Sequence, residues 1–160
     1  MKTPEQACLS KCLQLLSKMA YSKRRLREKL GAVYDAKIVE QVIAYAEDKH
    51  YLDEQRDCSI WLEHYRNHSK KSNQEIIALL SKRGYERELI KICLGSADPE
   101  EEIHKAIAIL QSLVIKKKPE DYKGKQKILQ KLLRHGFPMD IVLKAYQIVC
   151  QEEADFNENF

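Results

Sequence analysis

The sequence predicts an all-α protein, an elongated and curved tandem of three three-helix repeats with a period of about 50 residues. Three observations predict this fold. The 160 residues are 44% hydrophobic and 32% charged with only five Gly and four Pro, which favours helices joined by tight connections over a β-sandwich or barrel. Apolar residues recur at intervals of three and four. Long and short helical patterns also follow one another in an order that repeats.

Residues 1–50 form the first predicted repeat, with a long helix, a short helix and a third helix. The long helix starts at Pro4, and its apolar face consists of Ala7, Cys8, Cys12, Leu15, Leu16 and Met19. Ser22 is a good N-cap for the short helix, which is basic and ends near Gly31. Asp35 caps the third helix, whose apolar stripe consists of Ile38, Val39, Val42, Ile43 and Ala46.

Residues 51–96 and residues 97–151 repeat this order. In the second repeat Asp53 opens the long helix, Ser72 caps the short one and Glu86 starts the third. In the third repeat Asp98 precedes Pro99, which is a cap followed by proline at the first helical position. Residues 152–160 follow as an acidic C-terminal tail.

The repeats can be aligned with one another. A shift of 52 residues superposes Gly84-Tyr85 on Gly136-Phe137, and a shift of 50 aligns the short helices of the first two repeats. Each glycine is predicted to stop a short helix, and each aromatic ring, together with Tyr34, is predicted to seal the core of its repeat. Because repeats this small bury too little apolar surface alone, we expect them to stack on their neighbours.

The N-terminal sequence and the cysteines favour a cytoplasmic protein. The first six residues lack the apolar region of a signal peptide, and the longest uncharged run, residues 106–115, is about half the length of a membrane span. The five cysteines are odd in number and form no CxxC pair, which favours reduced thiols over a disulfide framework. We expect no membrane segment.

The chain lacks the common catalytic and cofactor motifs. GxxxxGK[ST], GxGxxG, HExxH and GxSxG are absent, so we expect neither enzyme activity nor a cofactor. His64 and His68 have a spacing that could share a metal, but no third ligand is evident, so no metal site is expected. Trp61 with Tyr65 could form a base-stacking platform, although such a pair belongs more often to the core.

Positive charge is concentrated in or beside the short helix of each repeat. Residues 22–29 carry a net charge of +4, and residues 116–134 contain eight basic and two acidic residues. Stacked repeats would tend to align these clusters as a basic track for a polyanion, either a nucleic-acid backbone or an acidic groove on a protein. Ordinary solvated helix faces are the other interpretation. The predicted contact residues are Lys23, Arg24, Arg25, Arg27, Lys70, Lys71, Lys82, Arg83, Lys123, Lys125, Lys127, Lys131 and Arg134.

Several short patterns resemble those of one family. In the first repeat and the start of the second they are Leu15-Leu16, Ser22, Leu26, Leu30, Tyr34-Asp35, Ile38-Val39, Tyr51-Leu52-Asp53 and Arg56. Two further patterns, Lys82-Arg83-Gly84-Tyr85 and Arg134-His135-Gly136-Phe137, end the later short helices. In order and spacing, over residues 7–150, these resemble the RecX recombination regulators, small bacterial proteins of tandem three-helix repeats. The chain departs from the family at Asp57-Cys58, where an aromatic residue followed by a small residue is usual. It also departs at Glu63-His64-Tyr65, where the family often has basic residues.

The resemblance implies a non-enzymatic regulator of DNA repair, recombination and the SOS response. Such a protein binds the RecA-type recombinase filament on single-stranded DNA, within the filament groove, and inhibits its ATPase and strand-exchange activity. The implied partners are the filament and, weakly and with salt dependence, single-stranded DNA; a monomer is expected. One alternative is a non-sequence-specific nucleic-acid-binding protein acting without a recombinase partner, and another is a helical-repeat adaptor for an unrelated protein.

Overall fold

A computed structural model describes residues 1–96, 98–116 and 122–158, with the side chains of residues 114–116 and 153–157 left out. These residues form nine α-helices and no strand, as the all-α prediction requires. The first three helices are α1 (Pro4–Lys18), α2 (Lys23–Gly31) and α3 (Ala36–Asp48). The next three are α4 (Glu54–His68), α5 (Asn73–Lys82) and α6 (Arg87–Leu94). The last three are α7 (Pro99–Lys116), α8 (Tyr122–Arg134) and α9 (Met139–Glu158).

Side chains cap the start of three helices, whereas Asp35 stands at the N-cap of α3 but its side chain makes no capping hydrogen bond. Thr3 and Gln6 form a capping box at the start of α1, in which each side chain binds the other residue's backbone N–H. Ser22 Oγ accepts the N–H of Arg25 at 3.2 Å, which starts α2. Ser72 Oγ accepts the N–H of Glu75 at 3.2 Å in the same way at α5. Side-chain acceptors at these positions satisfy N–H groups that have no partner inside the helix.

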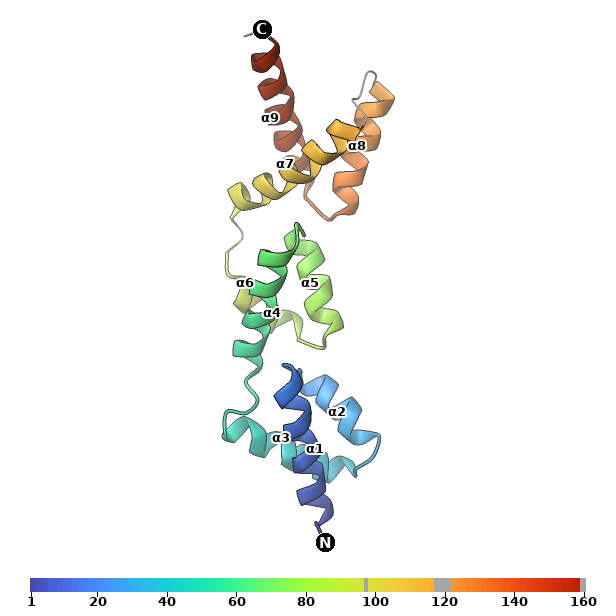
Figure 1. The fold of residues 1–160 in the computed structure, drawn as a ribbon, viewed down its shortest axis with the longest axis vertical. Helices are drawn as coiled ribbons and strands as arrows, with labels where there is room; N and C mark the ends of the chain where they lie inside the picture. The colour runs from blue at the N-terminus through green and yellow to red at the C-terminus, as the bar shows by residue number, and fades with distance from the viewer. Residues whose placement is uncertain (97, 117–121, 159–160) are drawn as a thin grey trace. The chain divides into compact units, whose positions relative to one another are not determined.

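The chain divides into two compact units, and the second repeat contributes to both. Unit 1 consists of residues 1–64 and 78–95, and unit 2 of residues 65–77 and 96–160. In unit 1, helices α1, α2 and α3 all contact one another, as Figure 1 shows. Their shared core consists of Cys8, Cys12, Leu15, Leu26, Leu30, Val39, Val42, Ile43, Ala46 and Leu52.

Unit 2 has its own core between α7, α8 and α9. Helix α7 packs against both α8 and α9, and α8 also contacts α9 (Figure 1). The buried residues there are Ala106, Leu110, Ile128, Leu129, Leu132, Phe137, Ile141, Val142, Ala145 and Val149. Their spacing of three and four along each helix is the amphipathic pattern seen in the sequence.

Two glycines stop short helices as predicted. Gly84 follows α5 with a φ of 102°, and Gly136 follows α8 with a φ of 91°. This left-handed backbone is strained for any residue with a Cβ atom. The aromatic residues after them, Tyr85 and Phe137, are each only 2% exposed, so their predicted role in sealing a core is confirmed. Tyr34 is half-buried against the first core.

Three expectations need correction or limits. Met19, predicted on the buried face of α1, follows the helix as its C-cap and is 38% exposed. The backbone turns away from the core there, since Met19 has an extended conformation with φ −164°. Most of the expected acidic tail continues α9, which ends at Glu158, and residues 159–160 lie outside the described chain. Lys117 and Lys118, counted in the third basic cluster, also lie outside it.

Candidate functional site

Helix α2 carries the four predicted contact residues of the first repeat. Three of them, Arg24, Arg25 and Arg27, are exposed, while Lys23 is half-buried. The structure gives each of these four cations an intramolecular partner. Three of the four therefore lie at the surface, and the contacts that all four make in this structure lie within the chain.

Arg24 and Arg25 reach the C-terminal end of α5. The Nη2 atom of Arg24 donates to the carbonyl oxygen of Ser81 at 3.1 Å, and Nη2 of Arg25 donates to the carbonyl oxygen of Lys82 at 3.3 Å. The last carbonyls of a helix have no donor inside the helix and form the negative end of its dipole. The two guanidinium groups thus cap α5 from a neighbouring repeat.

Lys23 and Arg27 pair with acidic residues of α3. Lys23 forms an ion pair with Glu47, and Nε of Arg27 lies 2.6 Å from Oε1 of Glu40. The hydrogen bond to Glu40 raises the pKa of Arg27 above its usual value. Ion pairs exposed to this degree contribute about 0–1 kcal/mol, so they orient these side chains more than they stabilise the fold.

Two clusters of contacts fasten short helices to each other, and we call them clasps. In the first clasp, Ser22 Oγ donates to the carbonyl oxygen of Arg83 at 2.8 Å. The N–H of Lys23 donates to Oε1 of Glu54 at 2.7 Å. A Cβ atom on Gly84 would overlap Ser22 Oγ. This clasp, made by residues 22, 23, 54, 83 and 84, lies wholly in unit 1.

The second clasp repeats these contacts in unit 2. Ser72 Oγ donates to the carbonyl oxygen of His135. The N–H of Asn73 donates to both carboxylate oxygens of Glu102 at 3.3 Å. Glu102 is buried and also pairs with Nζ of Lys105 at 3.1 Å. The second clasp therefore consists of residues 72, 73, 102, 135 and 136, each equivalent in role to a residue of the first.

The clasps do not follow from the sequence alone. The sequence predicts Ser22 and Ser72 as helix caps and Gly84 and Gly136 as helix stops, and the short helices of the first two repeats align. The available signal is that both serines precede a glycine-aromatic pair by a similar separation, 62 residues from Ser22 to Gly84 and 64 from Ser72 to Gly136. Which carbonyl a serine hydroxyl reaches depends on the packing of distant segments, since the bonded residues are 61 and 63 positions apart.

Trp61 and Arg83 form a stacked pair inside unit 1. The guanidinium carbon of Arg83 lies 3.1 Å from the centre of the indole ring, and the indole N–H donates to the carbonyl oxygen of Ala20 at 3.3 Å. A cation over an aromatic face is attracted by the ring quadrupole. Trp61 is half-buried rather than enclosed in the core, and Arg83 covers one face of its ring.

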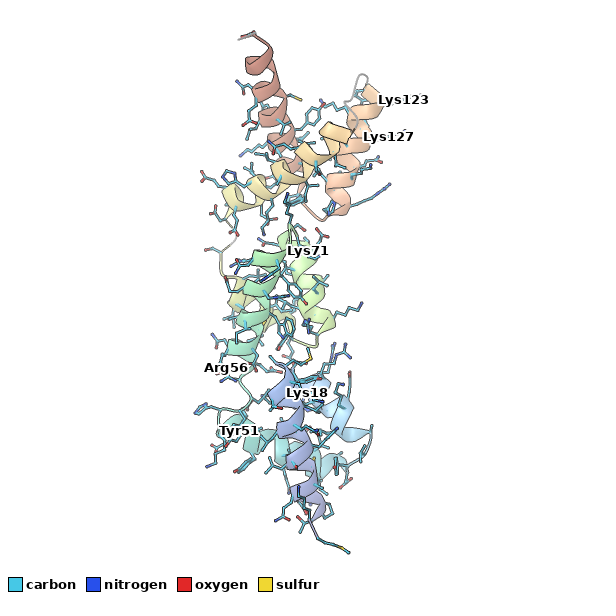
Figure 2. All side chains as sticks on the ribbon, in the orientation of Figure 1. Lys18, Tyr51, Arg56, Lys71, Lys123 and Lys127 are labelled. Atoms are coloured by element: carbon cyan, nitrogen blue, oxygen red, sulfur yellow. The ribbon has the colours of Figure 1, made fainter. Side chains whose placement is uncertain are left out.

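The remaining cations near α5 lie at the surface. Lys70 and Lys82 are exposed, and Lys71, labelled in Figure 2, is half-buried. Within the described chain, none of these three lysines forms an ion pair.

Helix α8 carries five cations of two kinds. Lys125 is half-buried, and its Nζ lies 5.0 Å from the centre of the Tyr146 ring. The other four are exposed, and they are Lys123, Lys127, Lys131 and Arg134. Figure 2 shows Lys123 and Lys127 on successive turns of α8. Thus the predicted contact residues separate into cations held by intramolecular contacts, mainly on α2, and cations that face solvent, mainly on α8.

The cysteines have the properties of core residues. Cys8, Cys12 and Cys58 are buried, and no disulfide is present among the described residues. Burial raises the pKa of Cys12 to about 11 and that of Cys58 to about 12. The thiolate is the reactive form of cysteine, and a raised pKa leaves little thiolate at neutral pH. These two thiols therefore remain protonated and pack as small apolar groups.

The part of the chain that the structure describes contains no candidate metal cluster and no candidate membrane-spanning helix. No group of three or more His, Cys, Asp or Glu side chains is placed there to hold a metal ion. No helix in that part is both long and apolar enough to cross a bilayer.

Three comparisons with known proteins all find matches in the same family. Residues 100–146 match the sequence model described as RecX, third three-helix domain. The regulatory protein RecX of a Thermus thermophilus strain is 28% identical over 147 residues, covering 92% of this chain and 94% of the relative. That of Clostridioides difficile is 27% identical over 137 residues, which is 83% of this chain but only 63% of the relative's length. The crystal structure of RecX from Lactobacillus salivarius has the same fold, with a TM-score of 0.84, 19% identity and coverage of 92% and 97%.

Proposed function

The chain belongs to the RecX family, and on that premise we propose that it is a non-enzymatic regulator of recombination and DNA repair. In this proposal it binds the RecA-type recombinase filament on single-stranded DNA in the cytoplasm and inhibits ATP hydrolysis and strand exchange. The observation that carries the proposal is the similarity, over most of the chain, to relatives named regulatory protein RecX. Their name describes regulation rather than catalysis.

The clasps support a role that needs well-positioned surfaces. Within each unit, a serine hydroxyl and a buried or half-buried carboxylate hold segments of neighbouring repeats together. A filament offers the same surface many times, so several weak contacts from one chain would add up to useful avidity. We propose that exposed cations beside the short helices supply these contacts.

The proposed contact residues follow from exposure. Lys70, Lys82 and the exposed cations of α8 face solvent in the structure, so they remain contact candidates. Arg24, Arg25 and Arg27 are exposed but engaged. A partner that used those three would have to compete with their present hydrogen bonds, each of which, being open to solvent, contributes about 0.5 kcal/mol.

One experiment tests the proposed function directly. ATP hydrolysis by the cognate recombinase on single-stranded DNA is titrated with this protein, with a Lys70→Glu/Lys82→Glu variant, and with a Lys11→Glu/Lys37→Glu control. The control changes net charge equally at exposed lysines of α1 and α3. We expect inhibition by the wild type and the control, at near-stoichiometric protein, and weaker inhibition by the variant. An unchanged rate with the wild type contradicts the proposal.

A second candidate function is nucleic-acid binding without a recombinase partner. The observation that favours it is the set of exposed cations on α8 that have no acidic partner among the described residues. A protein of that class binds bare single strands tightly at physiological salt, whereas a filament regulator needs to bind them only weakly. Tight binding to bare strands together with an unchanged ATPase would favour this second function.

A further inference from the structure

One face of α8 carries an unbroken row of cations, which we call the α8 ridge. It consists of Lys123, Lys127, Lys131 and Arg134, all exposed. At 3.6 residues per turn, these four positions fall within an arc of about 80°, and successive lysines are about 6 Å apart along the axis. The buried face of the same helix, with Ile128, Leu129 and Leu132, points into the unit 2 core. The α8 ridge therefore faces solvent along the length of the helix.

The α8 ridge is electrostatically unfavourable in the free protein. Lys123 and Lys127, and Lys127 and Lys131, are like charges at i,i+4, an arrangement that destabilises a helix. Helix α8 contains no acidic residue, and no described carboxylate pairs with the ridge. The cations of α2, by contrast, lie within ion-pair distance of Glu28 in the same helix and of Glu40 and Glu47 in α3. An anionic ligand would relieve this repulsion on α8 and would gain little on α2.

An exposed aromatic residue lies at one end of the α8 ridge. Tyr122, the first residue of α8, is 74% exposed and precedes Lys123. A tyrosine this exposed gains nothing from the core. Proteins that bind single-stranded nucleic acids combine cations that follow the backbone with aromatic rings on which unpaired bases stack.

We propose that the α8 ridge binds the phosphate backbone of single-stranded nucleic acid and that Tyr122 stacks on one of its bases. The inference rests on the proposed function for the presence of single-stranded DNA, and it assigns that contact to the third repeat rather than to the more strongly basic α2. Lysine binds phosphate as a flexible point charge, so no base sequence is read. Lys125 is outside the site because it lies against Tyr146.

The charge part of the site is tested by binding without any recombinase. Fluorescence anisotropy of a labelled oligothymidylate is measured over a range of salt concentrations with wild type and with Lys123→Gln/Lys127→Gln/Lys131→Gln. The matched control is Lys11→Gln/Lys18→Gln/Lys37→Gln, which removes the same charge from exposed lysines of unit 1. Each lost phosphate contact lowers the slope of log affinity against log salt by about 0.7, so the ridge variant should lose about 2 in slope and on the order of tenfold or more in affinity. The control should retain both.

Two further variants complete the test. Replacing the three ridge lysines by arginine keeps the charge and should keep the affinity and the slope. Tyr122→Ala should weaken single-strand binding about tenfold and leave binding to duplex DNA unchanged. Far-ultraviolet circular dichroism at each step shows that the variants are folded.

Several outcomes would overturn the inference. They are equal losses in the ridge and control variants, no binding of the oligothymidylate by wild type, or tighter binding of polyglutamate than of the oligothymidylate, which would indicate an acidic protein partner. The proposed function fails separately. If the ridge variant loses DNA binding as predicted while wild type leaves recombinase ATP hydrolysis unchanged, the inference holds and the proposed function does not. If wild type inhibits ATP hydrolysis but binds no bare strand, the proposed function holds and the inference does not.

Discussion

The first and second clasps hold the same backbone groups with different surrounding side chains. In both, a serine hydroxyl donates to the carbonyl oxygen of the residue just before a left-handed glycine. A carboxylate accepts the backbone N–H of the residue that follows the serine. Around the first clasp the helper side chains are Arg24 and Arg25, which cap α5. Around the second, Oε1 of Glu75 lies 3.1 Å from Nδ1 of His135.

This difference shows which part of the repeat is fixed by geometry and which part is free to vary. The serine and the glycine recur because a short hydroxyl and a backbone without a Cβ atom are needed where two segments approach closely. The flanking positions need only some polar group that can reach a helix end or an opposite charge. Cations on α2 are therefore explained by the first clasp, whereas those on α8 are not explained by the second.

The largest expected effect comes from a methyl group at either glycine. Gly84→Ala places a Cβ atom on Ser22 Oγ at a φ of 102°, and Gly136→Ala places one 2.6 Å from Cβ of Gln74 at a φ of 91°. Backbone strain and overpacking together should cost about 3 kcal/mol. The loss should be larger at Gly84, since Ser22 cannot move without breaking its hydrogen bond. Urea denaturation measures both.

Gly31→Ala is the matched control for these two variants. A Cβ atom on Gly31 meets nothing within 4 Å, and the residue ends α2 without a left-handed backbone. This variant should be neutral or gain up to about 0.8 kcal/mol from helix propensity. Equal losses at all three glycines would mean that the clasps do not determine stability.

The next effect comes from removing the clasp hydroxyls. Ser22→Ala and Ser72→Ala each lose a helix cap, about 1 kcal/mol, and leave a carbonyl near Gly84 or Gly136 without its donor, about 1–2 kcal/mol more. Thr3→Ala is the control, because Thr3 caps α1 at an exposed site and holds no other repeat. Thermal unfolding of the three variants should show about twice the loss at the serines. Three equal losses would mean that the two serines contribute to stability only as helix caps and that their hydrogen bonds to distant carbonyls add nothing.

The aromatic residues behind the clasps differ in one oxygen atom. Tyr85 is buried, and its hydroxyl has no hydrogen-bond partner among the described residues, whereas Phe137 has no hydroxyl. Burial, followed by the negative charge of Asp57, raises the pKa of Tyr85 above its ordinary value of 10.0. The fold therefore favours the neutral phenol, so this contribution to stability is complete below pH 10 and is lost progressively as the pH rises above it.

Tyr85→Phe should accordingly stabilise the protein by about 1 kcal/mol at neutral pH, because a buried unpaired polar group is removed. It should also reduce the loss of stability above pH 10. Urea denaturation at pH values on both sides of 10 measures both effects. The buried thiols titrate in the same range in both proteins, so the difference between variant and wild type isolates Tyr85. A destabilised Tyr85→Phe variant would mean that the hydroxyl has a partner in solution.

Local features of this protein were predictable from sequence, and tertiary contacts were not. Apolar spacing predicts the helices, and Ser22, Ser72, Gly84 and Gly136 predict four of their ends, because caps and stops depend on a few neighbouring residues. Charge counting identified the basic clusters of α2 and α8 equally. It could not distinguish them, since the acidic partners of α2 come from α3 and its carbonyl acceptors come from α5, distant in the chain.

The smallest expected effect tests that distinction at the cations themselves. Arg24→Ala/Arg25→Ala removes two exposed hydrogen bonds to the α5 carbonyls, and because these bonds are open to solvent the loss should be about 1 kcal/mol in total. Lys82→Ala, at an exposed lysine near the same carbonyls, is the control and should change stability by less than about 0.5 kcal/mol. If the α2 cations serve the first clasp, the double variant will lose thermal stability while its affinity for an oligothymidylate stays within about twofold of wild type. The opposite result, unchanged stability with a large loss of affinity, would make α2 a nucleic-acid contact and would remove the contrast between the two basic helices.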